Sequence, residues 1–390
     1  MRVWIENPFD NLPAEGFRPQ RYWLMAEAFA RAGHDVVLWT ADFNHTTKAK
    51  RVLCAAAARP FALELVHEPP YSSNVSLGRM YSHWRYAREW ARRAVAYAKS
   101  HGAPDVVVAS TPPLCACAAA RRLARRFGAK VVVDVMDAWP ETFERVVPRW
   151  ALWPLRRAAK ANYLGADLVT VVADRYIELV RGYGYAGDAE RFYHGIDMAD
   201  GAFEERVPAK DRPLALAYVG NLGRTYDLAT VVRALAWLPD ATLDIAGRGE
   251  GEEPLRRLAA DLGLGERVRF RGYLGEDEMV SLLAKCGVGV VPMSAESFVG
   301  VPYKFCDYAR AGLAIVSSLG GESAKLLAKY GAGALYRASD PASLARALSS
   351  LDAAKCGANA RRMAEIELDA ASIYNAYVAR VSWLMDANSR

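Results

Sequence analysis

The chain has 390 residues, 52% of them apolar and 24% charged, with a formal net charge of +6 at pH 7. These values are typical of a folded globular protein and exclude a disordered chain. No apolar run reaches the roughly 20 residues that a membrane-spanning helix needs, and the start of the chain does not resemble a secretory signal. Because single cores stop growing beyond about 250–300 residues, we predict two domains.

The excess positive charge lies in the first half. Residues 1–200 contain 27 Lys or Arg against 21 Asp or Glu, while residues 201–390 contain 23 of each. A basic half fits an anionic membrane surface or a phosphorylated ligand. No nucleic-acid-binding motif is present in the sequence, so we expect no nucleic acid partner. The six cysteines are scattered, and no His, Cys or carboxylate cluster has metal-ligand spacing. We therefore expect a cytoplasmic protein without a metal or cofactor.

Strands and helices are predicted to alternate along the chain. In the first half, strands are expected at 3–5, 36–39, 106–108, 131–133 and 168–172, and helices at 18–32, 79–100, 114–127 and 150–163. In the second half, strands are expected at 214–220, 242–247, 268–270, 288–291 and 314–316, and helices at 227–237, 251–262, 276–286 and 302–311. Valine-rich strands separated by helices are typical of parallel sheets covered on both faces.

The alternation therefore predicts two doubly wound α/β domains. The first is expected to span residues 1–200 and the second residues 201–370, with a linker near 198–212. A last helix at 371–387 has apolar positions at helical spacing, and we expect it to return to the first domain.

The segment from Ala295 to Gly312 carries the most informative pattern in the chain. It follows the apolar run 288–292, and Pro302 suits the first position of a helix because it has no N–H to leave unpaired. Lys304 would lie in the first turn, and Asp307 about one turn later on nearly the same face. A helix N-terminus attracts anions, so the pattern predicts a nucleotide site. The alternative is a solvated lysine and an ordinary surface acid.

Several segments, taken together, resemble family 4 glycosyltransferases. In the second half they are 218–223 (YVGNLG), 245–249 (IAGRG), 268–274 (VRFRGYL) and 302–312 (PYKFCDYARAG). In the first half they are 33–36 (GHDV), 134–141 (DVMDAWPE) and 194–197 (HGID), of which DVMDAWPE is similar to a subgroup that builds cell-surface polysaccharides. The resemblance spans nearly the whole chain. It implies the GT-B fold, in which two Rossmann-like domains face a central cleft. It also implies retaining transfer of a sugar from a nucleoside diphosphate, UDP or GDP.

The residues of the second half fit a sugar–nucleotide site. The glycines of 220–223 follow a predicted buried strand and permit a tight loop with close backbone approach. Arg224 would contact a phosphate in a bidentate manner, and Lys304 supplies a second cation. The residues expected to bind the sugar nucleotide are Gly220, Asn221, Gly223, Arg224, Arg248, Tyr273, Glu296, Val301, Lys304 and Asp307.

The sequence departs from the family pattern at one place. The family commonly has two glutamates with seven residues between them, and Asp307 takes the position of the second. The position of the first is Val299, which is not acidic. Glu296 lies three residues earlier and is the alternative acid. Asp307 can still accept hydrogen bonds from ribose hydroxyls.

In the first half, Asp137 is the candidate for chemistry. It follows a predicted strand, and a carboxylate there would hydrogen-bond the transferred sugar or deprotonate an acceptor hydroxyl. The alternative is that Asp137 caps the helix-like segment that follows it. We predict catalytic roles for Asp137, Arg224 and Lys304, and acceptor binding by Arg18, His45 and Glu141.

The segment 149–157 combines two tryptophans with arginines, which suits a bilayer interface. Together with the arginines of helices 79–100 and 114–127, it predicts peripheral association with an anionic membrane surface, here the inner face of the plasma membrane. Solvated helix faces are the alternative. The acceptor would then be a glycan or a polyprenyl-linked glycan.

Two other functions stay open: a nucleotide-sugar epimerase, which needs no acceptor, and a non-catalytic nucleotide-sugar-binding scaffold.

Overall fold

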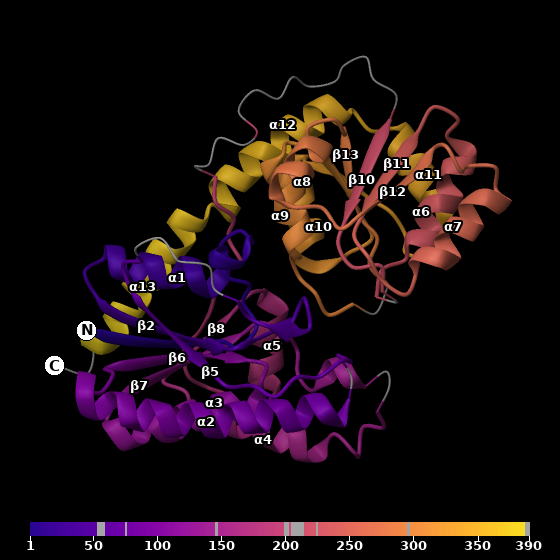
Figure 1. Ribbon diagram of the computed structural model, residues 1–390. Helices are drawn as coiled ribbons and strands as arrows, with labels where there is room; N and C mark the ends of the chain where they lie inside the picture. Colours follow the sequence, from indigo (N-terminus) through magenta and orange to yellow (C-terminus); the bar gives the residue numbers. More distant parts are fainter. Residues whose placement is uncertain are drawn as a thin grey trace. The chain divides into compact units, whose positions relative to one another are not determined.

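The computed structural model describes residues 1–52, 59–74, 76–144, 147–198, 203, 214–223, 225–294 and 297–386. Contacts divide the chain into two compact units, Met1–His194 with Ala371–Arg390, and Gly195–Ala370 (Figure 1). Apart from residues 198 and 203, the linker predicted at 198–212 lies outside the described residues.

The first unit is built on a parallel sheet in the order β5-β2-β1-β6-β7-β8-β9. Its strands are β1 Arg2–Glu6, β2 Asp35–Ala41, β5 Ala62–Val66, β6 Val106–Thr111, β7 Lys130–Val135, β8 Leu168–Val171 and β9 Ala189–Arg191; a small antiparallel pair, β3 Phe43–Asn44 and β4 Ala49–Lys50, lies outside the sheet. Its helices are η1 Pro13–Glu15, α1 Arg21–Arg31, α2 Leu77–His101, α3 Leu114–Phe127, η2 Glu141–Phe143, α4 Trp153–Leu164 and α5 Asp174–Gly182.

Helices cover both faces of this sheet. Figure 1 shows α2, α3 and α4 on one face, with α1 and the C-terminal helix α13 (Ala370–Asp386) on the other. All six residues of β6 are buried, as expected for a central valine-rich strand covered on both sides.

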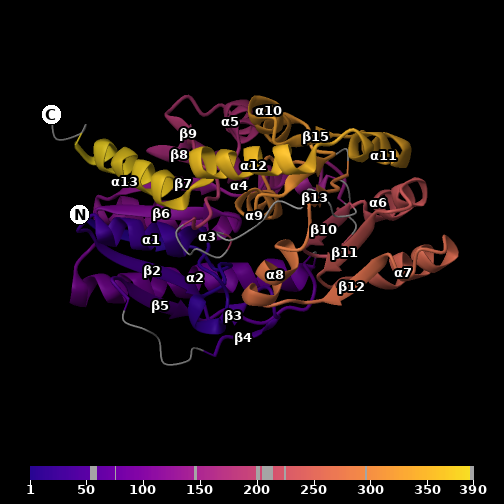
Figure 2. The same cartoon turned by 90° about the horizontal axis from the view of Figure 1, so that it is seen from above.

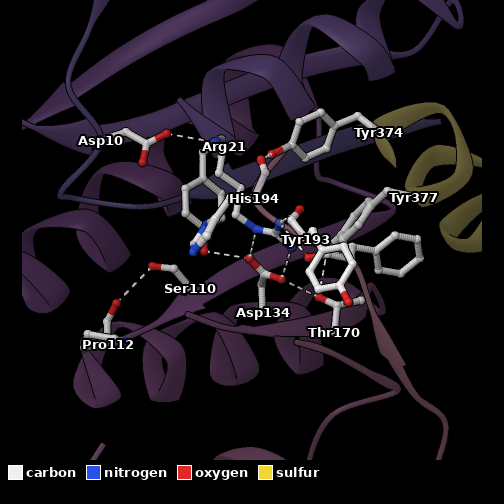
Figure 3. A network of polar contacts seen from close by, with 12 residues as sticks. Asp10, Arg21, Ser110, Pro112, Asp134, Thr170, Tyr193, His194, Tyr374 and Tyr377 are labelled. Carbon is white, nitrogen blue, oxygen red and sulfur yellow. Dashed lines mark hydrogen bonds and ion pairs between the residues drawn. The ribbon is translucent and has the colours of Figure 1, made fainter. Parts of the chain in front are cut away.

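A buried polar network joins α13 to the first unit (Figure 3). Arg21 on α1 forms a two-pronged ion pair with Asp134 on β7, with N···O distances of 2.8 Å, and both side chains are fully buried. Arg21 also donates to the carbonyl oxygens of Phe192 and Tyr193. The Tyr374 hydroxyl of α13 donates to the carbonyl oxygen of His194. The network therefore also holds the last residue of the segment Met1–His194.

The second unit has a parallel six-stranded sheet in the order β12-β11-β10-β13-β14-β15. Its strands are β10 Ala215–Val219, β11 Thr242–Ala246, β12 Val268–Gly272, β13 Val288–Val291, β14 Ala314–Ser317 and β15 Gly333–Leu335. Its helices are α6 Leu228–Ala234, η3 Leu235–Trp237, α7 Glu252–Asp261, α8 Glu276–Leu283, α9 Tyr303–Arg310, α10 Gly321–Tyr330, α11 Pro341–Ser349, α12 Ala353–Met363 and η4 Ala364–Leu368. Figure 2 shows β10, β11 and β12 side by side in this sheet.

The strand orders confirm two doubly wound sheets. In each one the strand order reverses beside the first strand, between β1 and β6 in the first unit and between β10 and β13 in the second. Open α/β sheets bind ligands at the carboxyl ends of such strand pairs. The loops that follow β10 and β13 are therefore the first place to look for a site.

Two local expectations need correction. Pro302 is not the first helical residue: its backbone is extended, with ψ 156°, and it is the N-cap of α9, which begins at Tyr303. Asp137 does not cap the following helix, because the cap of η2 is Pro140. Within the described residues, no helix combines the length and apolar character that a bilayer crossing requires.

Candidate functional site

Two glycine-rich loops of the second unit are in direct backbone contact. The loop after β10 holds the predicted residues Gly220, Asn221 and Gly223, and the loop after β11 holds Arg248. The Leu222 N–H donates to the Arg248 carbonyl at 3.0 Å, and the Gly220 N–H donates to the carbonyl at the end of β11 at 2.9 Å. Gly247 and Gly249 are needed for this approach, since the atom nearest to a Cβ at either position is a backbone carbonyl oxygen.

Gly247 shows the constraint most clearly. Its φ is +143°, and a Cβ there would collide with the carbonyl group of Gly220. A Cβ on Gly249 would lie 2.6 Å from the Leu222 carbonyl oxygen. Positive φ and lack of space both favour glycine at 247, so the two loops form a compact shelf of backbone at the edge of the sheet.

Lys304 lies in the first turn of α9, beside this shelf. Its side chain is buried, and its Nζ donates to the Tyr218 hydroxyl at 3.0 Å. The same Nζ lies 4.1 Å from the ring centroid of Tyr218 and 3.6 Å from that of Tyr226. A Cβ on Gly220 would be only 2.9 Å from this Nζ, so the missing side chain makes room for the lysine.

Burial lowers the pKa of Lys304 well below its ordinary value, and the charge of Asp307 opposes that shift in part. Because the surrounding groups are aromatic rings and hydroxyls, the cation has little compensation in this environment. An anion placed beside Lys304 would favour the protonated form. The arrangement is therefore suited to holding a phosphate group.

The other predicted residues of the second unit differ in exposure. Asp307 and Val301 are buried, at 5% and 3% exposure, whereas Tyr273, just after β12, is 57% exposed. Asn221 and Arg248 are exposed on the two loops. Gly223 lines a cavity of 360 Å³ between the starts of α6 and α7. Arg224 and Glu296 lie outside the described residues.

In the first unit, Asp137 follows β7 and is half-buried. Its Oδ1 accepts a hydrogen bond from the Ala138 N–H at 2.8 Å. Burial raises the pKa of Asp137 to about 6, against the hydrogen bond from Ala138 and the nearby charge of Arg79. A carboxyl group with that pKa is suited to exchange protons near neutral pH.

The predicted acceptor residues lie in separate surroundings. His45 is half-buried, and its Nδ1 lies 2.5 Å from the Tyr71 hydroxyl; burial lowers its pKa to about 3, so the ring is neutral. Glu141 Oε1 accepts from the Tyr183 hydroxyl at 2.5 Å, within the unit's own structure. Arg18 is half-buried in the loop before α1. Acceptor binding by these three residues stays a prediction.

Sequence reasoning missed the aromatic partners of the site. Tyr218 and Tyr226 hold Lys304, although Tyr218 is 86 residues away along the chain. Tyr218 lies in the YVGNLG segment, whose apolar pattern indicates a strand but not a contact with Lys304. Arg79, whose charge reaches Asp137, lies in the first turn of α2 and has no sequence signal beyond a charged helix start.

Comparisons with known proteins agree with this architecture. The family model described as Glycosyltransferase Family 4 matches residues 21–200, and the model described as Glycosyl transferases group 1 matches residues 201–365. The chain is 27% identical over 224 residues to D-inositol 3-phosphate glycosyltransferase 1 of Catenulispora acidiphila, covering 50% of this chain and 52% of the relative. It is 21% identical over 275 residues to the putative colanic acid biosynthesis glycosyl transferase WcaI of Escherichia coli, covering 58% of this chain and 67% of the relative.

A solved structure supports the same fold. The Anabaena protein Alr3699/HepE, determined in complex with UDP, matches with a TM-score of 0.69 and 16% identity, over 97% of this chain and 98% of that protein. The chain spans between about half and two thirds of the length of the two curated relatives above. Because the two family models match consecutive halves that together extend over residues 21–365, the chain belongs to the family 4 glycosyltransferases of the GT-B fold.

Proposed function

We propose that the protein transfers a sugar, with retention of configuration, from a nucleoside diphosphate sugar to a hydroxyl group of a glycan or lipid-linked glycan. The observation that carries the proposal is the position of Lys304. It follows β13, the backbone shelf at Gly220 follows β10, and these strands are the pair beside which the strand order reverses. This is where doubly wound sheets bind nucleotides, and here it offers backbone and a buried cation.

The proposed roles follow from charge development during transfer. The departing nucleoside diphosphate gains negative charge, which Lys304 and Arg224 would stabilise without a metal ion. Asp307 would accept hydrogen bonds from the ribose. The remaining predicted residues, Asn221, Gly223, Arg248, Tyr273, Glu296 and Val301, would line the site. The UDP of the Anabaena structure favours a uridine nucleotide, with GDP as the alternative.

The acceptor would bind on the first unit. Asp137, with its pKa raised to about 6, would hydrogen-bond the transferred sugar or take the proton of the acceptor hydroxyl. Arg18, His45 and Glu141 would contact the acceptor. The relatives' names include an inositol phosphate and a polysaccharide pathway, which supports a polyhydroxylated acceptor.

A panel of UDP- and GDP-sugars, assayed for nucleotide release with and without candidate glycan acceptors, tests the proposal. Lys304→Met is expected to lower turnover at least about 100-fold, the scale of losing one preorganised electrostatic contact. Lys325→Met is the matched control, because Lys325 is an exposed lysine on α10. Full activity of Lys304→Met would refute the assigned role. Isomerisation of the sugar without any acceptor would identify an epimerase, and tight binding without turnover a scaffold.

We also propose that the first unit binds an anionic membrane surface from the cytoplasm. Helix α2 carries six Lys or Arg side chains against the single acid Glu89, α3 carries four and α4 three, with no acid in either. These helices lie on one face of the sheet (Figure 1). Each basic side chain near an anionic surface contributes about 1 kcal/mol, so the helical face complements a phospholipid layer.

Exposed apolar side chains accompany this charge. Leu77, Met80, Tyr81 and Trp84 follow helical spacing at the start of α2 and are all exposed, and Trp150 and Trp153 are 81% and 61% exposed. Sedimentation with phosphatidylcholine vesicles, with and without phosphatidylglycerol, tests this part. Binding is expected only to the anionic vesicles, and it should weaken in Trp150→Ala/Trp153→Ala. Trp237→Ala, at a tryptophan of the second unit that is 58% exposed, is the control. Equal binding to both kinds of vesicle would contradict the charge argument.

A further inference from the structure

Arg79 and Lys48 lie among aromatic side chains at the carboxyl edge of the first sheet. The guanidinium carbon of Arg79 is 5.5 Å from the ring centroid of Phe9, 5.9 Å from that of Tyr71 and 5.0 Å from that of Trp139. These rings follow β1, β5 and β7, so three strand ends converge on one cation. Lys48, in the turn between β3 and β4, has its Nζ 4.6 Å from the Tyr71 centroid.

The hydrogen-bond partners of both cations are uncharged. Arg79 Nε donates to His83 Nε2 at 3.2 Å, and Nη1 donates to the Asn74 carbonyl oxygen at 2.8 Å. Lys48 Nζ donates to the side-chain oxygen of Asn74 at 2.6 Å. Within the described part of the chain, neither cation forms an ion pair with a carboxylate. Two half-buried positive charges therefore share one small region without a direct counterion.

The nearby histidines add hydrogen-bonding capacity but no charge. Burial, together with the neighbouring cations, lowers the pKa of His45 and of His83 to about 3. Because His83 Nε2 accepts from Arg79, its proton is on Nδ1. His45 Nδ1 faces the Tyr71 hydroxyl and, at 3.3 Å, the Lys48 ammonium group, which leaves its proton on Nε2. The ring is thus a neutral N–H donor.

The nearest acids compensate the cations only in part. Glu68 and Asp137 act on Arg79 through space, but burial raises their pKa values to about 7 and about 6. A carboxyl group with a pKa near 7 is protonated for part of the time at neutral pH. The region consequently keeps a positive potential that a bound anion would neutralise.

We propose that Arg79 and Lys48 form a subsite for a phosphate or diphosphate group of the acceptor. This inference rests on the proposed transferase function and refines it, since it makes the acceptor a phosphorylated molecule. A planar guanidinium beside an ammonium group matches the several oxygens of a phosphoryl group better than a single carboxylate would. The phosphoryl group can belong to a soluble sugar phosphate or to a prenyl-linked glycan, because both present the same oxygens.

Calorimetric titration of the full chain with inorganic pyrophosphate tests the subsite. The protein is first saturated with UDP, so that the proposed site beside Lys304 is occupied. Arg79→Gln and Lys48→Gln are each expected to weaken pyrophosphate binding about tenfold or more, as for loss of a charged hydrogen bond. Arg31→Gln, an exposed arginine of α1 on the opposite face of the sheet, is the control and should bind as the unaltered protein does.

A second titration uses farnesyl diphosphate, a soluble prenyl diphosphate. Tighter binding than that of pyrophosphate, weakened in Arg79→Gln, would identify a lipid-linked source, and equal binding a soluble one. Thermal melting checks the fold of each variant, and Arg79→Lys keeps the charge if Arg79→Gln melts early. Arg79→Lys is then expected to bind more weakly than the unaltered protein, because it lacks the guanidinium fork.

The outcomes separate the subsite from the transferase. Unchanged pyrophosphate binding in both glutamine variants, or no binding by the nucleotide-saturated protein, would overturn the subsite and leave the transferase untouched. Conversely, a protein that turns over no nucleotide sugar but loses pyrophosphate binding in Arg79→Gln would have the anion subsite without the proposed reaction.

Discussion

Replacing Asp134 by asparagine tests how much the buried network contributes to the first unit. Asp134 Oδ2 accepts from Arg21 Nε at 2.8 Å and from the Tyr22 hydroxyl at 2.7 Å. Its Oδ1 accepts from Arg21 Nη2 at 2.8 Å and from the Thr170 hydroxyl at 2.6 Å. Asparagine has the same shape, but it removes the charge and turns one acceptor into a donor that faces other donors. The arginine charge then stays buried without a counterion.

Breaking a buried ion pair from one side costs about 3–5 kcal/mol of folding free energy. For a unit of this size, that corresponds to a fall in melting temperature of roughly 6–20 °C. The Asp35→Asn variant is a matched control in the same unit. Asp35 pairs with Arg2 at 2.6 Å, but its side chain is 59% exposed. Exposed pairs contribute about 1 kcal/mol or less, so the control should melt within a few degrees of the unaltered protein.

Differential scanning calorimetry measures both variants, and hydrogen exchange locates the loss. Exchange should rise in β9 and α13, because the network holds the carbonyl groups of Phe192 and Tyr193 and contacts Tyr374 and Tyr377. If Asp134→Asn and Asp35→Asn lower the melting temperature equally, burial does not set the strength of this ion pair. The reasoning would then be wrong.

Three further predictions concern single residues. Glu6 is fully buried, and this burial raises its pKa to about 8, against the opposing influence of the Tyr86 hydroxyl. Between pH 4.5 and 8 the folded state therefore keeps a proton on Glu6 that the unfolded chain has lost. The free energy of unfolding should for this reason fall by about 1.4 kcal/mol for each pH unit of increase in that range. Melting curves of Glu6→Gln should show a weaker decline between pH 5.5 and 8, and an unchanged decline would refute this. Gly247→Ala should weaken nucleotide binding about tenfold or more in calorimetry, because its Cβ strikes Gly220, whereas Gly263→Ala, also at positive φ but with open space, should bind normally. Nucleotide binding at pH 8.5 should take up protons, because the diphosphate raises the lowered pKa of Lys304. The uptake is measured as a binding enthalpy that depends on the buffer. Proton uptake that persists in Lys304→Met would contradict this prediction.

The central strands and many helices were predictable because each carries its own local signal, but the helices at 174–182, 321–330, 341–349 and 353–363 were not predicted. Central strands such as 106–108 are runs of valine, and the helix expected at 79–100 is α2, Leu77–His101. The strand at 189–191, Ala-Glu-Arg, has no such run, and the sequence reading missed it, as it missed β5 and β15. Short edge strands owe their structure to pairing with a neighbour, which a local window does not contain.

The site shows the same limit at the level of single side chains. Lys304 was identified from its position at a helix start, but its partner Tyr218 is contributed by another strand. Asp134 and Asp137 are three residues apart in one motif. Because both are aspartates, the sequence does not indicate which of them is structural and which is the candidate for chemistry. Asp134 is fully buried against Arg21, 113 residues earlier, whereas Asp137 is half-buried after the strand. Only the tertiary partner decides which carboxylate is structural.

The partners of the buried and half-buried cations also indicate which charges are available to a ligand. Arg21 is neutralised by Asp134, so its charge serves the fold. Lys304 and Arg79 instead rest against aromatic faces, and Lys48 shares the Tyr71 ring with Arg79. A cation–π contact contributes about 0.5–2 kcal/mol and leaves the positive charge in place. A carboxylate partner would have to be displaced before a phosphate could bind, whereas a ring does not compete. Aromatic support therefore positions these groups without a carboxylate that an incoming anion would have to displace. This favours Lys304, whose lowered pKa an anion would raise, in one unit and Arg79 with Lys48 in the other as the phosphate-binding groups.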